Sequence, residues 1–339
     1  MADRIAAERP NGEGSDAEWL VEEGIGETRA ILMQRGEIAA ARIDRPGTLA
    51  AGQVADAVLV ARTAGAKRGT VRFPSGEEAL VDGLPQEASE GAPLRVIVTR
   101  AAIAESGRLK RAQGRPSQDA PRPAPTLAER LRMEGYMART VHQFPDEGWY
   151  ELFHEAWDGI VPVDGGRLTI SLTPAMTVID IDGALPARAL ALAAVPAIAS
   201  AIRRFDLAGS IGIDFPTLPG KADRRCVDDA LSAALADWNH ERTSMNGFGF
   251  VHLVARLERP SLMHCIARDR AGAAARLLMR RAEHVSGPGA ILLCAHPAVH
   301  GAMTPGWEAE LARRTGKVIR WRDDPGLALN GGFAQAVPL

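Results

Sequence analysis

Two short runs of β-branched residues, each ending in an aspartate, limit the folds that this chain can adopt. The first run, residues 176–183, reads MTVIDIDG, and the second, residues 210–215, reads SIGIDF. The segment between them is rich in alanine and leucine, which is typical of a helix. A strand, a crossover helix and a second strand usually place the two strands side by side and parallel. Both strands then end at the same edge of a sheet, where α/β proteins bind their ligands.

The polar residues at these strand ends are carboxylates. Asp180 and Asp214 end the two runs, and Asp182 follows Asp180 by two residues, so it faces the same side of a strand. Carboxylate oxygens are the ligands that Mg²⁺ prefers. The sequence therefore predicts a divalent-cation site built from Asp180, Asp214 and Asp182. Each aspartate taken alone has a structural alternative, as a helix cap or a loop residue.

Composition limits the class of protein. The 339 residues are enough for two domains, and a hydrophobic share of 46% allows a large core. The net charge of −2 does not indicate a polyanion partner, so any RNA-binding surface must come from local arginine clusters. Cys226, Cys265 and Cys294 form no CxxC pair, which favours a reduced, cytoplasmic protein without zinc. Residues 1–17 are polar and predict a flexible tail, and no apolar run is long enough to span a membrane.

The pattern of elements changes twice along the chain. Residues 18–106 read as short strands between turn signals, which predicts a small OB-type β-barrel with a flanking strand. Phe73 is the internal aromatic candidate for base stacking in this barrel. Residues 107–126 are rich in proline and predict a linker without regular structure. Residues 127–339 alternate between helix and strand patterns, which predicts an α/β region with its metal site within about residues 170–262.

A charged segment follows one of the predicted strands. Residues 256–262 read RLERPSL and precede a predicted helix. Arg256 and Arg259 are therefore candidates for contacts with a phosphodiester backbone, and the alternative is a solvated charged loop. The sequence contains no GxSxG elbow, HExxH motif or Walker pattern, so serine hydrolase, zinc protease and nucleotide-binding functions have no support.

Taken together, these segments resemble the RNase E/G family of bacterial endoribonucleases. Residues 205–215, FDLAGSIGIDF, are similar to the family's Arg-Asp-Leu-Gly-Gly-x-Ile-x-Ile-Asp-Phe. Residues 172–180, LTPAMTVID, are similar to its Thr-Glu-Ala-Leu-Thr-x-Ile-Asp stretch. The similarity is colinear over most of residues 18–325, and its other segments are residues 26–30, 163–168, 248–249, 259–262 and 314–325.

The resemblance implies a fold and an activity. The fold would be α+β, with an N-terminal S1-like OB-type β-barrel and a C-terminal α/β catalytic half that has RNase H-like and DNase I-like parts. Asp180 and Asp214 fall on the family's two magnesium-binding aspartates, and Asp182 falls on a family asparagine. The implied activity is metal-dependent endonucleolytic cleavage of single-stranded RNA to 5′-phosphate and 3′-hydroxyl ends, with Mg²⁺ or Mn²⁺. A non-catalytic RNA-binding or regulatory protein on the same fold remains the alternative.

Two family features have no counterpart in this sequence. Where the family has a Cys-Pro-x-Cys zinc link, the chain has Cys265 alone, so we expect no bound zinc and any homo-oligomer must use another interface. Where the family has a 5′-sensor region, the chain has the proline-rich residues 107–126. We therefore expect cleavage to be indifferent to the chemical state of the RNA 5′ end.

Overall fold

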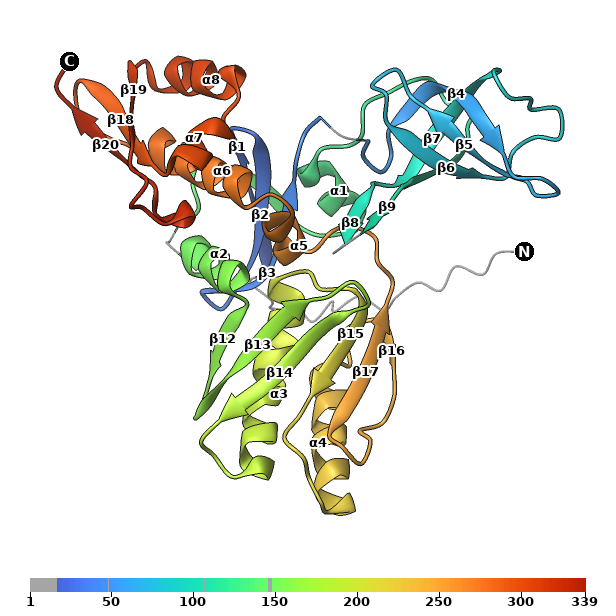
Figure 1. Cartoon of the computed structure of the whole chain (residues 1–339), viewed down its shortest axis with the longest axis vertical. Helices are drawn as coiled ribbons and strands as arrows, with labels where there is room; N and C mark the ends of the chain where they lie inside the picture. The colour runs from blue at the N-terminus through green and yellow to red at the C-terminus, as the bar shows by residue number, and fades with distance from the viewer. Residues whose placement is uncertain (1–16, 48, 106–107, 146–147) are drawn as a thin grey trace.

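The structure is a computed structural model that describes residues 17–47, 49–105, 108–145 and 148–339. It is a mixed α+β protein with a closed five-stranded barrel, which confirms the coarse fold prediction. Three lobes extend from a central four-stranded sheet (Figure 1). Most of the predicted tail, residues 1–16, and residues 106–107, where the predicted barrel ends and the predicted linker begins, lie outside the described residues.

The central sheet combines strands that precede the barrel in the sequence with one strand that follows it. Its strand order is β11-β1-β2-β3, in which β1 and β2 form one antiparallel hairpin and β2 and β3 another. The chain then leaves to form the barrel and returns as β11, which pairs with β1 in parallel, so the barrel is an insertion. Helix α1 covers one face, and Thr126 and Glu129 form a capping box at its start. The bounds are β1 Glu18–Gly24, β2 Glu27–Gln34, β3 Glu37–Asp44, β11 Ala138–Val141 and α1 Leu127–Met133.

The barrel closes through a strand that the sequence analysis placed in the linker. Its order is β10-β6-β5-β4-β7, and β10 pairs with β6 in parallel and with β7 antiparallel. A Cβ atom at Gly114 of β10 would lie 2.6 Å from Val96 Cγ1, so glycine permits the close approach of β10 to β7. The predicted linker over residues 107–126 is therefore wrong for β10. The bounds are β4 Val54–Arg62, β5 Arg68–Arg72, β6 Glu78–Asp82, β7 Pro93–Arg100 and β10 Ala112–Pro116, and a short ribbon, β8 Ile103–Glu105 with β9 Arg108–Lys110, lies beside it.

The lowest lobe in Figure 1 is a six-stranded sheet backed by two helices. Its order is β12-β13-β14-β15-β17-β16, and α3 connects β14 to β15. These two strands are parallel neighbours, as the sequence predicted, whereas the other pairs in this sheet are antiparallel. The bounds are β12 Ile160–Val163, β13 Gly166–Leu172, β14 Thr177–Gly183, β15 Gly209–Asp214, β16 His240–Arg242, β17 Phe250–Ala255, α3 Ala187–Arg204 and α4 Lys221–Ala234.

The last three strands form a separate sheet, so the predicted α/β region contains more than one sheet. This C-terminal sheet has the order β19-β18-β20 and packs against α6. The bounds are β18 Ala290–Ala295, β19 Ile319–Asp323, β20 Phe333–Val337, α2 Gly148–Asp158, α5 Leu262–Arg268, α6 Arg270–Glu283, α7 Pro297–Gly301, α8 Pro305–Thr315 and the 3₁₀ turn η1 Leu329–Gly331.

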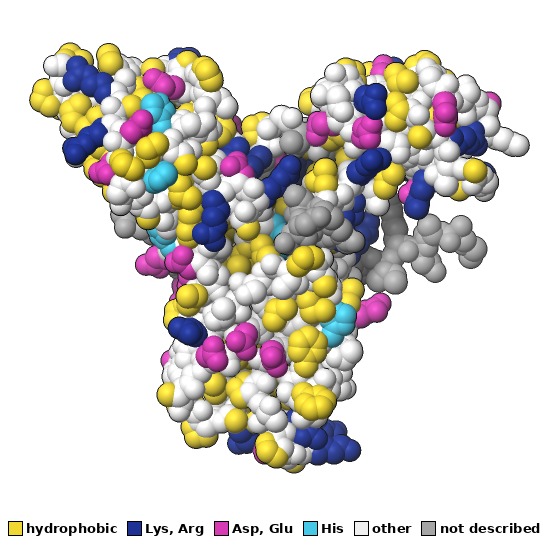
Figure 2. All heavy atoms as spheres, viewed as in Figure 1, with side chains coloured by type: hydrophobic (Ala, Val, Ile, Leu, Met, Phe, Trp, Pro, Cys, Tyr) yellow, Lys and Arg dark blue, Asp and Glu magenta, His cyan; other side chains and the backbone are white. Residues whose placement is uncertain are grey.

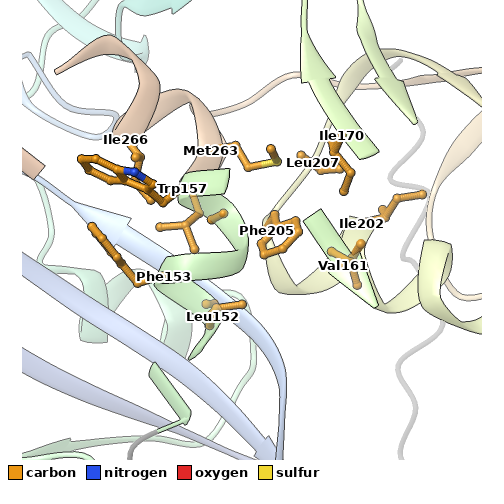
Figure 3. Packing of buried hydrophobic residues seen from close by; sticks show 14 of the residues in the cluster. Leu152, Phe153, Trp157, Val161, Ile170, Ile202, Phe205, Leu207, Met263 and Ile266 are labelled. Atoms are coloured by element: carbon orange, nitrogen blue, oxygen red, sulfur yellow. The ribbon is translucent and has the colours of Figure 1, made fainter. Parts of the chain in front are cut away.

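One hydrophobic core runs through the central sheet, the six-stranded sheet and the C-terminal sheet, whereas the barrel has a core of its own. Figure 3 shows the junction, where Trp157 of α2 and Ile266 of α5 lie on one side and Phe205, at the end of α3, on the other. Because these side chains are buried together, α2 and α5 fix the six-stranded sheet to the rest of the molecule.

Candidate active site

The six-stranded sheet has one face against helices and one face that no described helix covers. Along β14 and β15, residues alternate between the two faces. Ile179, Ile181 and Ile213 point toward α3 and α4 and are at most 5% exposed. The residues between them point to the open face and include Asp180 and Asp214. Figure 2 shows acidic side chains in a row on this face, with hydrophobic side chains next to them.

The two strand-end aspartates are direct neighbours. Asp180 pairs with Asp214 in the parallel register of β14 and β15, whose backbones lie about 4.8 Å apart in such a sheet. Asp182 is two residues further along β14, on the same face and exposed. The structure therefore places the three carboxylates that the sequence selected on one face of the sheet, with Asp180 and Asp214 in direct register.

The electrostatics of this group oppose the ionised state of its central member. Partial burial raises the pKa of Asp180, and the charges of Asp182 and Asp214 raise it further. A hydrogen bond of 3.0 Å, which the Ile181 amide donates to Asp180 Oδ1, acts in the opposite direction. A cation at this point would relieve the repulsion and favour the charged carboxylate.

The donor set fits a hydrated Mg²⁺ rather than an ion held by protein ligands alone. Within the described part of the chain, no three His, Cys, Asp or Glu side chains lie close enough to hold one metal ion. Mg²⁺ in proteins commonly keeps several waters and takes only one or two carboxylates. Asp180 and Asp214 supply that number, and Asp182 is not part of a preformed three-ligand cluster.

Different side chains flank the carboxylates on the two sides of the row. Arg167 of β13 is exposed and pairs in register with Asp182. On the other side, Phe250 of β17 pairs in register with Asp214. A Cβ atom at Gly212 would lie 2.5 Å from Phe250 Cζ, so the phenyl ring lies over this glycine, two residues before Asp214. The acidic row therefore has a basic flank and an aromatic flank.

The aromatic flank includes a second ring on a well-ordered turn. Asn246 Oδ1 accepts hydrogen bonds from the amides of Phe248 and Phe250, at 2.9 and 3.1 Å. Gly249 has a φ of +93°, and a Cβ atom there would lie 2.4 Å from the Phe215 carbonyl oxygen. This turn presents Phe248 to solvent at 81% exposure. Phe248 and Gly249 entered the sequence resemblance only as a short segment, although the run NGFG, an aromatic residue between turn-forming residues, marks an exposed ring in the sequence.

A polar pair lies further along the aromatic flank. Ser210 Oγ and His252 Nε2 are 2.8 Å apart, and both residues belong to the open face. His252 pairs in register with Gly212, which separates it from Asp214 by one position on the same face. No sequence motif includes His252, so only the structure reveals this pair.

The structure does not bring the two predicted arginine contacts to the carboxylates. Ala255, just before Arg256, pairs with Gly209 at the opposite end of β15 from Asp214. Arg256 therefore lies about 20 Å from the carboxylates along the strand direction. Arg259 donates a 2.6 Å hydrogen bond to Asp206 in the turn that follows α3, and this ion pair gives it a structural role. Neither arginine therefore belongs to the immediate surroundings of the carboxylates.

The burial of Phe73 contradicts the prediction that its ring stacks on RNA bases. Its side chain is 4% exposed and belongs to the hydrophobic core of the barrel, together with Leu59, Val71 and Val96. A ring that fills the barrel interior presents no face to a base. Phe73 is therefore a core residue of the barrel.

Comparison with models of known protein families finds no match, and comparison with curated protein sequences finds no significant one. Within the described residues, no helix has both the length and the apolar character needed to cross a bilayer.

Proposed function

We propose that this protein is a metal-dependent endoribonuclease that cleaves single-stranded RNA, with Asp180 and Asp214 as its catalytic, metal-binding residues. The observation that carries the proposal is the register pairing of these two carboxylates on an uncovered sheet face. The motif resemblance to the RNase E/G family supports the same assignment. Under this proposal, the barrel is of the S1-like OB type, and the remaining sheets correspond to the RNase H-like and DNase I-like parts.

The residues of the site would hold Mg²⁺, or Mn²⁺, and orient the RNA. When bound, such an ion lowers the pKa of a coordinated water and stabilises charge that develops on the phosphate. Asp180 and Asp214 would contribute the protein ligands, and Asp182 adds negative charge next to them. Water attacks phosphorus and the bond to the 3′ oxygen breaks, which leaves a 5′-phosphate and a 3′-hydroxyl. We place this activity in the cytoplasm and propose no zinc at Cys265.

The test is cleavage of a labelled single-stranded RNA by Asp180→Asn and Asp214→Asn variants. Each variant should lose at least about 100-fold in rate, since each removes a charged ligand of the ion. Asp229→Asn is the matched control, because this aspartate on α4 is 73% exposed and distant from the site in the fold. Full activity of either site variant, or of the wild type in excess EDTA, would refute the assignment.

A non-catalytic RNA-binding protein is the second candidate. It is favoured by Asp182 at the position where the resemblance places a family asparagine. RNA binding without cleavage in either Mg²⁺ or Mn²⁺ would select this candidate. Restoring the asparagine with Asp182→Asn then shows whether this one residue suppresses cleavage.

A further inference from the structure

We propose that Phe248 and Phe250 form a stacking subsite for an unpaired nucleobase of the RNA, next to the phosphate that is cleaved at Asp180 and Asp214. This inference rests on the proposed function and extends it to the way the substrate is positioned. No sequence feature assigned these two rings a role.

The first support is the position of Phe250 relative to the carboxylates. It pairs in register with Asp214, so the two side chains leave the same face of adjacent strands, about 5 Å apart at their Cβ atoms. Its ring extends over Gly212, where any side chain would collide with it. The ring is therefore held against the open face of the sheet. It belongs to the strand next to the one that carries Asp214.

The second support is the exposure of Phe248 on a rigid support. At 81% exposure, it is the most exposed aromatic ring among the described residues. The turn that carries it is fixed by two amide hydrogen bonds to Asn246 and by Gly249, which fits against the Phe215 carbonyl. Because the turn keeps this phenyl ring exposed to solvent, its apolar surface contributes no burial free energy to the fold. A planar apolar ligand would supply that burial.

The third support is the combination of chemistries along the open face. Rings on one side of the carboxylates and Arg167 on the other match a nucleic acid strand, which has a flat base and an anionic phosphate in each nucleotide. Stacking on an aromatic ring is open to every base, so this contact is tolerant of sequence. Duplex RNA is disfavoured because its bases already stack on each other.

The test measures RNA affinity separately from cleavage. In an Asp180→Asn background, which prevents cleavage, fluorescence anisotropy gives the Kd of a short single-stranded RNA for each Phe248 variant. Phe248→Ala should raise Kd about tenfold, within the range found for base–aromatic stacking, whereas Phe248→Trp should keep it. Val254→Ala is the matched control, because Val254 is another exposed apolar side chain of the same sheet face, near the far end of β17. It should leave Kd unchanged.

Abasic RNA identifies the ligand of the rings. A series of oligonucleotides, each with one abasic nucleotide at a different position, should contain one member that the parent and the Phe248→Ala protein bind equally. The subsite would be overturned if Phe248→Ala lost the same affinity for every oligonucleotide of the series. It would also be overturned if Phe248→Ala changed Kd no more than Val254→Ala does. Failure of the parent to bind RNA would overturn it too, and loss of self-association in Phe248→Ala would then identify the rings as a protein interface. Absence of cleavage by the wild type, with the stacking effect intact, would refute only the nuclease.

Discussion

A buried ion-pair network joins the central sheet to the C-terminal lobe, and its central residue is Glu22 of β1. Glu22 is 1% exposed and accepts hydrogen bonds from the guanidinium groups of Arg29 on β2 and Arg280 on α6. Both arginines are at most 4% exposed, and Arg280 also pairs with Glu283 at 2.6 Å. The carboxylate therefore balances positive charge that has no access to solvent.

We predict that Glu22→Gln lowers the free energy of unfolding by about 3 kcal/mol. Removing one partner of a buried ion pair costs about 3–5 kcal/mol, because the other charge stays buried. Glutamine keeps the shape of the glutamate side chain and one acceptor oxygen, so we expect a loss at the lower end of this range. The measurement is urea unfolding followed by tryptophan fluorescence, which does not report on the barrel because all six tryptophans lie outside it. With a slope of about 3 kcal/mol/M, the midpoint falls by about 1 M.

Glu18→Gln on the same strand is the matched control. Glu18 pairs with Arg139 at 3.2 Å, but their side chains are 38% and 60% exposed. Exposed pairs of this kind contribute at most about 1 kcal/mol, so this variant should unfold near the wild-type midpoint. A loss in Glu22→Gln no greater than in Glu18→Gln would refute the reasoning that this network holds the two parts together.

Three further outcomes follow from the site and the cysteines. In EDTA, Asp180→Asn should raise the urea midpoint of unfolding at pH 7, because the raised pKa of Asp180 means that the folded state disfavours the ionised carboxylate. This increase in the midpoint should vanish below about pH 3.9, where the carboxyl group is protonated in the folded and the unfolded state. Native protein treated with iodoacetamide should be modified first at Cys226, since Cys265 and Cys294 are buried and burial raises the pKa of the Cys265 thiol to about 11; mass spectrometry of the digest measures this order. Single-stranded RNA with a 5′-monophosphate and the same RNA with a 5′-hydroxyl should be cleaved at equal rates, and a tenfold preference for the monophosphate would reveal a 5′ sensor.

The sequence predicted the site best where one local pattern determined both the fold and the chemistry. Isoleucines at every second position of β14 and β15 required one face to be buried, which fixed the face on which Asp180 and Asp214 lie. The alanine-rich helix α3 between them required parallel pairing. These two constraints were sufficient to place the carboxylates side by side.

Predictions failed where the outcome depended on partners distant in sequence. Proline-rich composition hid β10, whose pairing is decided by the edges of β6 and β7 and by the room at Gly114. Phe73 was the aromatic residue of its stretch, and only closure of the barrel shows that its ring is needed inside. The charged segment after β17 pointed to Arg259, but it gave no sign of the ion pair with Asp206, which is 53 residues away in the sequence.

Glu22 and Asp180 show how differently this chain treats two carboxylates. The buried Glu22 is surrounded by arginines from two elements, so its charge contributes to stability. Asp180 is partly buried, yet it has two carboxylates as neighbours, and none of the three forms an ion pair with a described residue. Nothing in the fold requires this repulsion, because asparagine would fit a solvent-facing position on a strand equally well. The structure elsewhere pairs its buried charges, but it leaves this group unpaired on an open face, where a bound cation would remove the repulsion.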